Sequence, residues 1–260
     1  MLLLATASAA AYFVAALQAA RGLEGSRNLL ALIAALLLHG LVLIANVQAL
    51  DGRLGLTQAL SLLTWQSALL LALLTQATAL RPLRTAIYPL AALGVLLAAL
   101  WPMHRGGSAP HDWRIALHAA LSIFAAGLLT LAAAQAVALQ VLDRLLHRPA
   151  QLARALKMPP MQASEDWLFQ LIGAGFFVLS LALLSGLIFV DDLFAQHLAH
   201  KTVLSIIAWL IFAGLLLGRR RWGWRGKQAV RWALSGYAAL LLAYFGSKLV
   251  LEQILGRHWS

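Results

Sequence analysis

The chain contains no cysteine among its 260 residues. Without thiols it forms no disulfides, thiolate zinc sites or iron–sulfur clusters, and no thioether link joins it to a cofactor. Charged residues are also scarce, at 11% of the chain, whereas a soluble domain uses roughly a quarter. The first absence excludes thiolate metal chemistry, and the second excludes an ordinary soluble domain.

Apolar residues take the place of the missing charges. They make up 62% of the chain, and the mean hydropathy is +0.82. Apolar runs of about 20 residues, the length that crosses a hydrocarbon core of about 30 Å, recur along the sequence. We therefore predict an all-α integral membrane protein, a bundle of about eight transmembrane helices forming a single domain over residues 1–260. The predicted helices lie near residues 2–20, 28–47, 58–80, 84–101, 114–140, 167–190, 200–218 and 230–250.

The basic residues indicate the orientation of this bundle. The formal net charge is +11, but the arginines and lysines lie in short loops between apolar runs, a pattern typical of topology signals and not of nucleic-acid binding. Fourteen of the 20 fall in alternate loops, including a long loop at 141–166 and a basic turn at 219–229. Because basic loops stay in the cytoplasm, we expect both termini on the external, periplasmic side.

Histidines are the candidate functional residues within the predicted helices. His118 lies near the external end of helix 114–140, and His39 lies in the outer half of helix 28–47. An imidazole inside a membrane is tolerated when it is neutral and hydrogen-bonded, ligates a metal, or faces water. Two roles therefore remain open for each residue: a bridge between helices, or a metal ligand.

The other ionisable residues of the chain, by their positions, favour metal ligation. All nine Asp and Glu residues lie in loops or at helix ends, so the predicted spans lack the carboxylates of a proton relay or cation carrier. Imidazole suits haem iron, which needs one or two axial nitrogens and an apolar cleft. At a rise of about 1.5 Å per residue, His39 and His118 lie at depths within about two turns, which would let them approach one haem from opposite faces.

Three further residues are weaker candidates for cofactor binding. His200 begins helix 200–218, where an exposed position at the membrane interface is the favoured interpretation. His258 lies two residues from the C-terminus, and Trp209 lies within helix 200–218, where it is a candidate for lining a cavity. The run RRRWGWRGKQAVRW, which begins at Arg219, is typical of an anchor for lipid headgroups.

Three segments resemble a known family: LHAALSIFAAGLLTLAAAQAVAL, HKTVLSIIAWLIFAGLLLGRRRWGWRGKQAV and YFGSKLVLEQIL. Together with His39 in LLLHGLVLIA, they are similar to the cytochrome c assembly membrane-protein family, the CcsA and HemX-like group, and most of all to its short bacterial inner-membrane branch, the YpjD-like proteins. The resemblance implies a multi-pass protein of the bacterial inner membrane that binds haem b non-covalently. Larger members hold haem between external histidines and deliver it to apocytochrome c.

Carried over by residue, the resemblance assigns His118 to the place of the first external haem-ligating histidine. His258, in LGRHWS, lies close to the place of the second, and His39 is the predicted axial partner of His118. The tryptophan-rich signature WGxxWxWD should precede KTVLSIIAW, but the loop reads LIFVDDLFAQHLAHK. Leu217 and Gly218 stand where larger members carry another histidine. These departures imply a haem-binding protein that is not an enzyme and not itself the synthetase.

Two other classes of function remain as alternatives. A transporter of small solutes or ions with a histidine-lined path would show broken helices and buried charge near the membrane midplane. A non-catalytic scaffold would use its basic loops to bind cytochrome maturation proteins or other membrane proteins.

The predicted orientation is testable with reporter fusions. A reporter enzyme that is active only in the periplasm should be active when fused after Ser260, because the basic loops hold the opposite side in the cytoplasm. A silent periplasmic reporter at this position, together with an active cytoplasmic one, would reverse the assignment of both termini.

Overall fold

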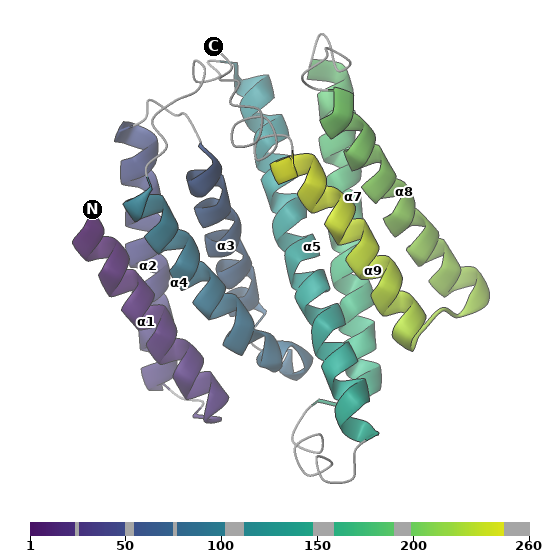
Figure 1. Ribbon diagram of the computed structural model, residues 1–260, viewed down its shortest axis with the longest axis horizontal. Coiled ribbons are helices and arrows are strands. Elements are labelled where there is room, and N and C mark those ends of the chain that lie inside the picture. The colour runs from purple at the N-terminus through teal and green to yellow at the C-terminus, as the bar shows by residue number, and fades with distance from the viewer. Residues whose placement is uncertain are drawn as a thin grey trace. The chain divides into compact units, whose positions relative to one another are not determined.

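The computed structural model describes residues 1–23, 26–49, 55–74, 77–101, 112–147, 159–189 and 199–246, and within these ranges every regular element is a helix (Figure 1). Seven of the helices are long and apolar enough to cross a membrane. The predicted all-α membrane architecture is therefore confirmed, while the sidedness of the termini stays a prediction. The elements are α1 (Leu2–Ala20), α2 (Ser26–Ala49), α3 (Leu56–Leu73), the 3-10 helix η1 (Thr78–Leu83), α4 (Arg84–Leu100), α5 (Trp113–Leu146), α7 (Met161–Phe189), α8 (Ala199–Trp222), α9 (Gly226–Leu241) and the π-helix η3 (Leu242–Gly246).

The chain forms two compact units, an N-terminal unit of residues 1–110 and a C-terminal unit of residues 111–259. In the N-terminal unit, α1 packs against α2 and α4, and α4 packs against α3. In the C-terminal unit, α5 packs along α7, and α9 contacts both α5 and α8 (Figure 1). Within the described residues each unit thus contains four α-helices, and the single domain expected from sequence stays a prediction.

The predicted helix 58–80 is wrong at its C-terminal end. The helix α3 stops at Leu73, and η1 then leads into α4. Pro82 lies inside η1, where the missing amide hydrogen and the restricted preceding residue disfavour a continuous α-helix. No glycine or proline interrupts the sequence LLTQATAL, so the apolar pattern contains no signal for the break. By contrast, α4 continues through Pro89.

Two helices are longer than their apolar runs. The helix α5 extends to Leu146 instead of residue 140, and α7 begins at Met161 instead of residue 167. The 34 residues of α5 span about 51 Å at 1.5 Å per residue, well beyond a hydrocarbon core of about 30 Å. Hydropathy predicts the apolar part of a helix, whereas these extra turns carry the charged residues Asp143, Arg144, Glu165 and Asp166.

Small residues bring α5 and α7 close together. A Cβ atom added at Gly175 of α7 would lie 2.7 Å from Cδ2 of Leu129 on α5, a fully buried side chain. Membrane helices associate through such close van der Waals packing, because lipid offers no hydrophobic driving force between them. The glycine therefore fixes how closely the two longest helices approach.

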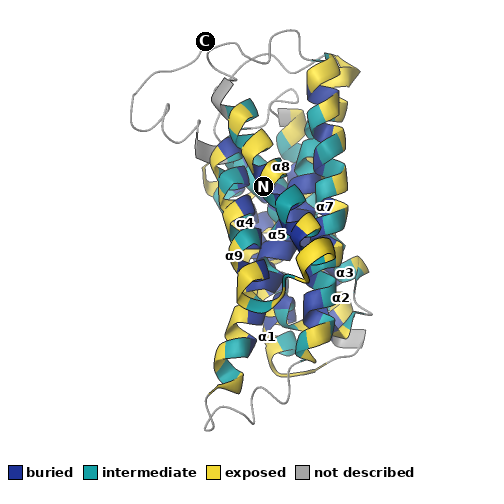
Figure 2. Cartoon of the chain, turned by 90° about the vertical axis from the view of Figure 1, so that its right-hand side faces the viewer, coloured by how far each residue is buried: buried dark blue, intermediate teal, exposed yellow. Residues whose placement is uncertain are grey.

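Large apolar side chains also cover the outer faces of the helices. Leu3, Leu73 and Ile188 expose 85%, 71% and 71% of their surface. Figure 2 shows buried and exposed residues on different faces of individual helices such as α7. Exposed apolar groups of this size suit contact with lipid chains, and the buried polar groups described below are turned inward.

The packing of Gly175 predicts a stability difference between two neighbouring glycines. Replacing Gly175 with alanine should lower the free energy of unfolding by about 1–3 kcal/mol, because the new methyl group overpacks Leu129. Gly173→Ala is the matched control: no atom lies within 4 Å of its added Cβ, so better helix propensity should stabilise it by up to about 1 kcal/mol. Thermal unfolding in detergent measures both, and equal upward shifts would contradict the packing.

Candidate functional site

His118 lies near the Trp113 end of α5 and turns its imidazole toward α7. Its Nδ1 atom lies 2.9 Å from the carbonyl oxygen of Ala182 and 3.0 Å from the hydroxyl of Ser185. A carbonyl oxygen only accepts, so Nδ1 carries the hydrogen and donates it. The Ser185 hydroxyl donates to the same carbonyl at 2.8 Å, which leaves its oxygen free to accept from Nδ1. The contacts on α7 therefore select the Nδ1–H tautomer of His118.

The selected tautomer leaves the lone pair on Nε2. Within the part of the chain that the structure describes, no residue hydrogen-bonds to this nitrogen. The imidazole is half-buried, so Nε2 is held by the protein yet reachable. A histidine that donates from one nitrogen to a backbone carbonyl, and presents the other, has the arrangement of a metal-ligating imidazole with its supporting hydrogen bond.

Gly186 of α7 leaves the space that the His118 imidazole occupies. A Cβ atom added there would lie 3.0 Å from Cε1 of His118. An added methyl group would force the ring or the helix to shift by a few tenths of an ångström. Sequence reasoning found His118 but missed Ala182, Ser185 and Gly186, because no pattern within α7 reveals its register against α5.

The same face of α5 carries other polar groups near His118. Arg114 precedes His118 by four residues and lies 5.9 Å over the ring of Trp113. Ser122 follows by four residues and hydrogen-bonds to Tyr244 of η3. The π-helix η3, which follows α9, therefore reaches α5 one turn from His118, and His258 lies outside the described residues.

His39 of α2 is fully buried and uses both ring nitrogens. Nδ1 lies 3.3 Å from the Tyr12 hydroxyl of α1, and Nε2 lies 2.8 Å from the Ser61 hydroxyl of α3. The Tyr12 ring also meets the imidazole edge-on, with centroids 5.8 Å apart. In this structure His39 bridges three helices, one of the two roles that the sequence left open. As an axial ligand it would have to release Ser61 or Tyr12.

The two histidines belong to different units, His39 to the N-terminal and His118 to the C-terminal unit. Their pairing on one haem therefore stays a prediction. Across the described segments, no three His, Asp or Glu side chains gather into a group that could hold a metal ion.

The remaining candidates are the tryptophan and the histidine of α8. Trp209 donates from Nε1 to the Ser180 hydroxyl at 2.8 Å and stacks on Phe176, with ring centroids 5.3 Å apart. Both partners belong to α7, so Trp209 ties α8 to that helix. His200 lies in the first turn of α8, and its side chain is outside the described residues.

At the other end of the C-terminal unit, carboxylates of α7 bind the basic turn of residues 219–229 and hold it against that helix. Glu165 is buried and accepts a hydrogen bond from the Gly226 amide at 2.8 Å. Asp166 lies 3.4 Å from the Arg219 guanidinium, which also lies 4.6 Å over the Phe169 ring. The turn predicted as a lipid anchor is therefore also held to α7 by ion pairs.

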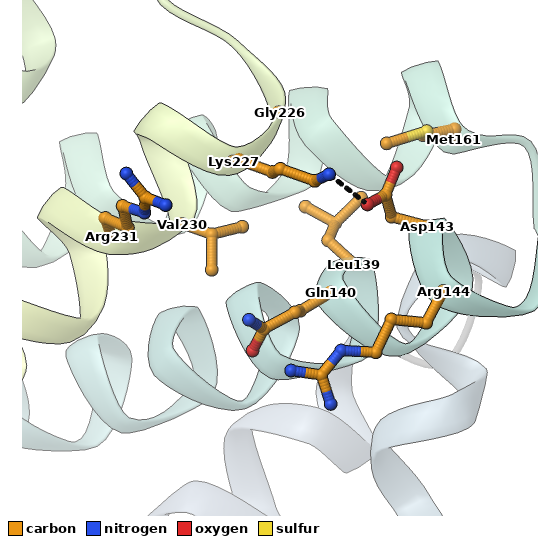
Figure 3. Close-up of a pocket in the computed structure, with 9 residues that line it drawn as sticks. All are labelled: Leu139, Gln140, Asp143, Arg144, Met161, Gly226, Lys227, Val230 and Arg231. Carbon is orange, nitrogen blue, oxygen red and sulfur yellow. Dashed lines mark ion pairs between the residues drawn. The ribbon is translucent and has the colours of Figure 1, made fainter. Parts of the chain in front are cut away.

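The first turns of α9, the last turns of α5 and Met161 of α7 line a partly open cavity of about 310 Å³ (Figure 3). Basic, acidic and apolar side chains all line it. Lys227 of α9 reaches across to Asp143 of α5 at 3.5 Å. Sequence reasoning missed this cavity, since Asp143 and Arg144 read as part of a loop.

Comparison with known proteins identifies the relatives of this chain. The family model described as cytochrome C assembly protein matches residues 1–255. The inner membrane protein YpjD of Escherichia coli K12 is 32% identical over 228 residues, covering 85% of each chain. An uncharacterized 28.8 kDa protein of Azospirillum brasilense is 39% identical over 159 residues, covering 60% of this chain and 57% of its own.

More distant relatives carry the name cytochrome c biogenesis protein CcsA. The protein of this name from Synechocystis is 23% identical over 121 residues, which cover 46% of this chain and 36% of that protein. No solved structure matches the chain.

The geometry predicts that the two histidines differ in their effect on stability. His39→Ala should lower the free energy of unfolding of the haem-free protein by about 2–4 kcal/mol, because it leaves a cavity and two buried hydroxyls without their partner. His118→Ala, the control, should cost about 1 kcal/mol, since its ring is half-buried. Unfolding by sodium dodecyl sulfate in mixed micelles compares them, and a His39→Ala variant as stable as wild type would rule out the bridge.

Proposed function

Because the chain belongs to the cytochrome c assembly protein family, we propose that it binds haem in the bacterial inner membrane and acts in haem handling or cytochrome c maturation. The inner-membrane name of its Escherichia coli relative and the seven apolar helices support this location. The names of the CcsA relatives support the link to cytochrome c biogenesis. In this proposal the haem is type b and non-covalent, since the chain has no cysteine.

The presentation of His118 Nε2 carries the proposal. Its partner nitrogen is fixed by Ala182 and Ser185, so the ring is oriented before any ligand arrives. Pre-orientation saves the entropy that a freely rotating imidazole would lose on coordination. The chain's own contribution is therefore an oriented imidazole whose Nε2 is left for iron.

The surroundings of His118 suit a porphyrin. Large apolar side chains near this end of α5 and α7 are exposed, among them Ile115, Leu117 and Ile188. They offer an apolar surface to the flat porphyrin ring. Arg114, one turn before His118, is placed to pair with a propionate, because a guanidinium binds a carboxylate through two hydrogen bonds. The site thus combines an axial nitrogen, apolar cover and a cation.

For the second axial position we propose His39, as the sequence predicts. Its Nε2 would exchange the Ser61 hydroxyl for iron, while Nδ1 keeps its contact with Tyr12 and supports the ring. Such an exchange leaves Ser61 to find another acceptor. His258 and His200 are the alternatives for this position.

We further propose that the protein is not itself the synthetase. The loop LIFVDDLFAQHLAHK contains no tryptophan, whereas the resemblance to larger members places their tryptophan-rich haem-binding signature there. Haem supplies an iron centre when bound, and this chain's residues bind and orient it. The protein would then hold haem as cargo or as a structural group for other maturation proteins.

Absorption spectroscopy of the purified full-length protein tests haem binding. Wild type with added haem should show a Soret band above the free-haem background in oxidised and reduced forms. His118→Ala should weaken haem binding at least about tenfold, the equivalent of a lost ligand bond of about 1.4 kcal/mol or more. His39→Ala should change the low-spin spectrum, whereas His200→Ala should not.

His147→Ala is the matched control for these variants. His147 lies at the opposite end of α5 and exposes 73% of its side chain, so its removal should leave the spectrum unchanged. A wild-type protein that never gains a Soret band would overturn the proposal. If His147→Ala weakened binding as much as His118→Ala, the assignment of the ligand would fail.

A further inference from the structure

The cavity at the basic end of the C-terminal unit has the chemistry of an anion site. Three cationic side chains, Arg144, Lys227 and Arg231, and one carboxylate, Asp143, line it, giving a formal net charge of +2. Its volume of about 310 Å³ is large enough for a phosphate with organic substituents. Figure 3 shows the lining side chains of α5 and α9 on either side of the space.

The charges in the cavity are unequally satisfied. Lys227 pairs with Asp143 at 3.5 Å, so the one carboxylate already has its cation. Among the residues that the structure describes, Arg144 and Arg231 have no acidic partner. A guanidinium fork matches the oxygens of a phosphate in two parallel hydrogen bonds. The two arginines are therefore the available anchors.

The wall of the cavity and the helix below it are apolar. Leu139, Met161 and Val230 line the cavity beside the arginines. On α5, Val137, Val141 and Arg144 follow at intervals of four and three residues, so they share one helix face. The two valines expose 47% and 43% of their surface. This exposed face changes from apolar to basic within two turns.

A soluble anion would gain nothing from that apolar track, whereas a phospholipid matches both parts. We propose that the cavity binds the headgroup of an anionic phospholipid, attracted by the positive charges of Arg144 and Arg231, with an acyl chain along Val137 and Val141. The long α5 helix carries Arg144 past the length that a hydrocarbon core needs, to the level expected for lipid headgroups. Basic pockets between membrane helices bind such headgroups through the same combination.

Binding of short-chain lipids to the full-length protein in detergent tests the site. Dihexanoyl phosphatidylglycerol should bind more tightly than dihexanoyl phosphatidylcholine when measured by native mass spectrometry. The double variant Arg144→Gln, Arg231→Gln should bind the phosphatidylglycerol about 30-fold more weakly, because each basic group contributes about fivefold near an anionic lipid. Both arginines are exposed, so the variant should keep the wild-type helical content.

The double variant Arg220→Gln, Arg221→Gln is the matched control, since it removes the same charge from outside the cavity. It should retain the wild-type preference. Equal losses in both double variants would show general electrostatic attraction and overturn the site. Glycerol phosphate, which has no acyl chains, should bind at least about tenfold more weakly than the lipid, because burial of each methylene group contributes about 0.8 kcal/mol. Equal binding would identify a free phosphate ester as the occupant and overturn the lipid assignment.

Discussion

The hydrogen bond from His118 Nδ1 to the Ala182 carbonyl is the interaction on which the proposed site depends. It joins α5 to α7, fixes the tautomer and leaves Nε2 as the free nitrogen. The bond exists because Gly175 and Gly186 let the two helices approach, one against Leu129 and the other against the imidazole itself. The same two glycines thus permit both the close packing of α5 against α7 and the orientation of the His118 imidazole.

The two intramembrane histidines show how different surroundings give one residue type different roles. His39 has hydroxyl partners on both nitrogens and no exposed surface, so it stabilises the N-terminal unit as it stands. His118 has backbone and hydroxyl partners on one nitrogen only, and it is half-buried. As an axial ligand, His39 would therefore give up one internal contact, whereas His118 would give up none.

Most of the fold was predictable from apolar length, because a hydrocarbon core selects runs of about 20 residues. His118 was predictable as a candidate functional residue, because an imidazole within an apolar run is costly unless it is hydrogen-bonded, ligates a metal or faces water. The break after Leu73 and the added turns of α5 and α7 were not, since chain geometry and surface contacts set them. Ser185, Gly186 and the cavity beside Arg144 depend on helix register, which one sequence does not contain.

A structure of the haem-loaded protein in a lipid nanodisc tests the central claim most directly. The account predicts haem iron at about 2.0 Å from His118 Nε2, a usual metal–imidazole distance, with Nδ1 still hydrogen-bonded to the Ala182 carbonyl. Haem bound elsewhere, with His118 still facing α7 and its Nε2 unligated, would contradict it.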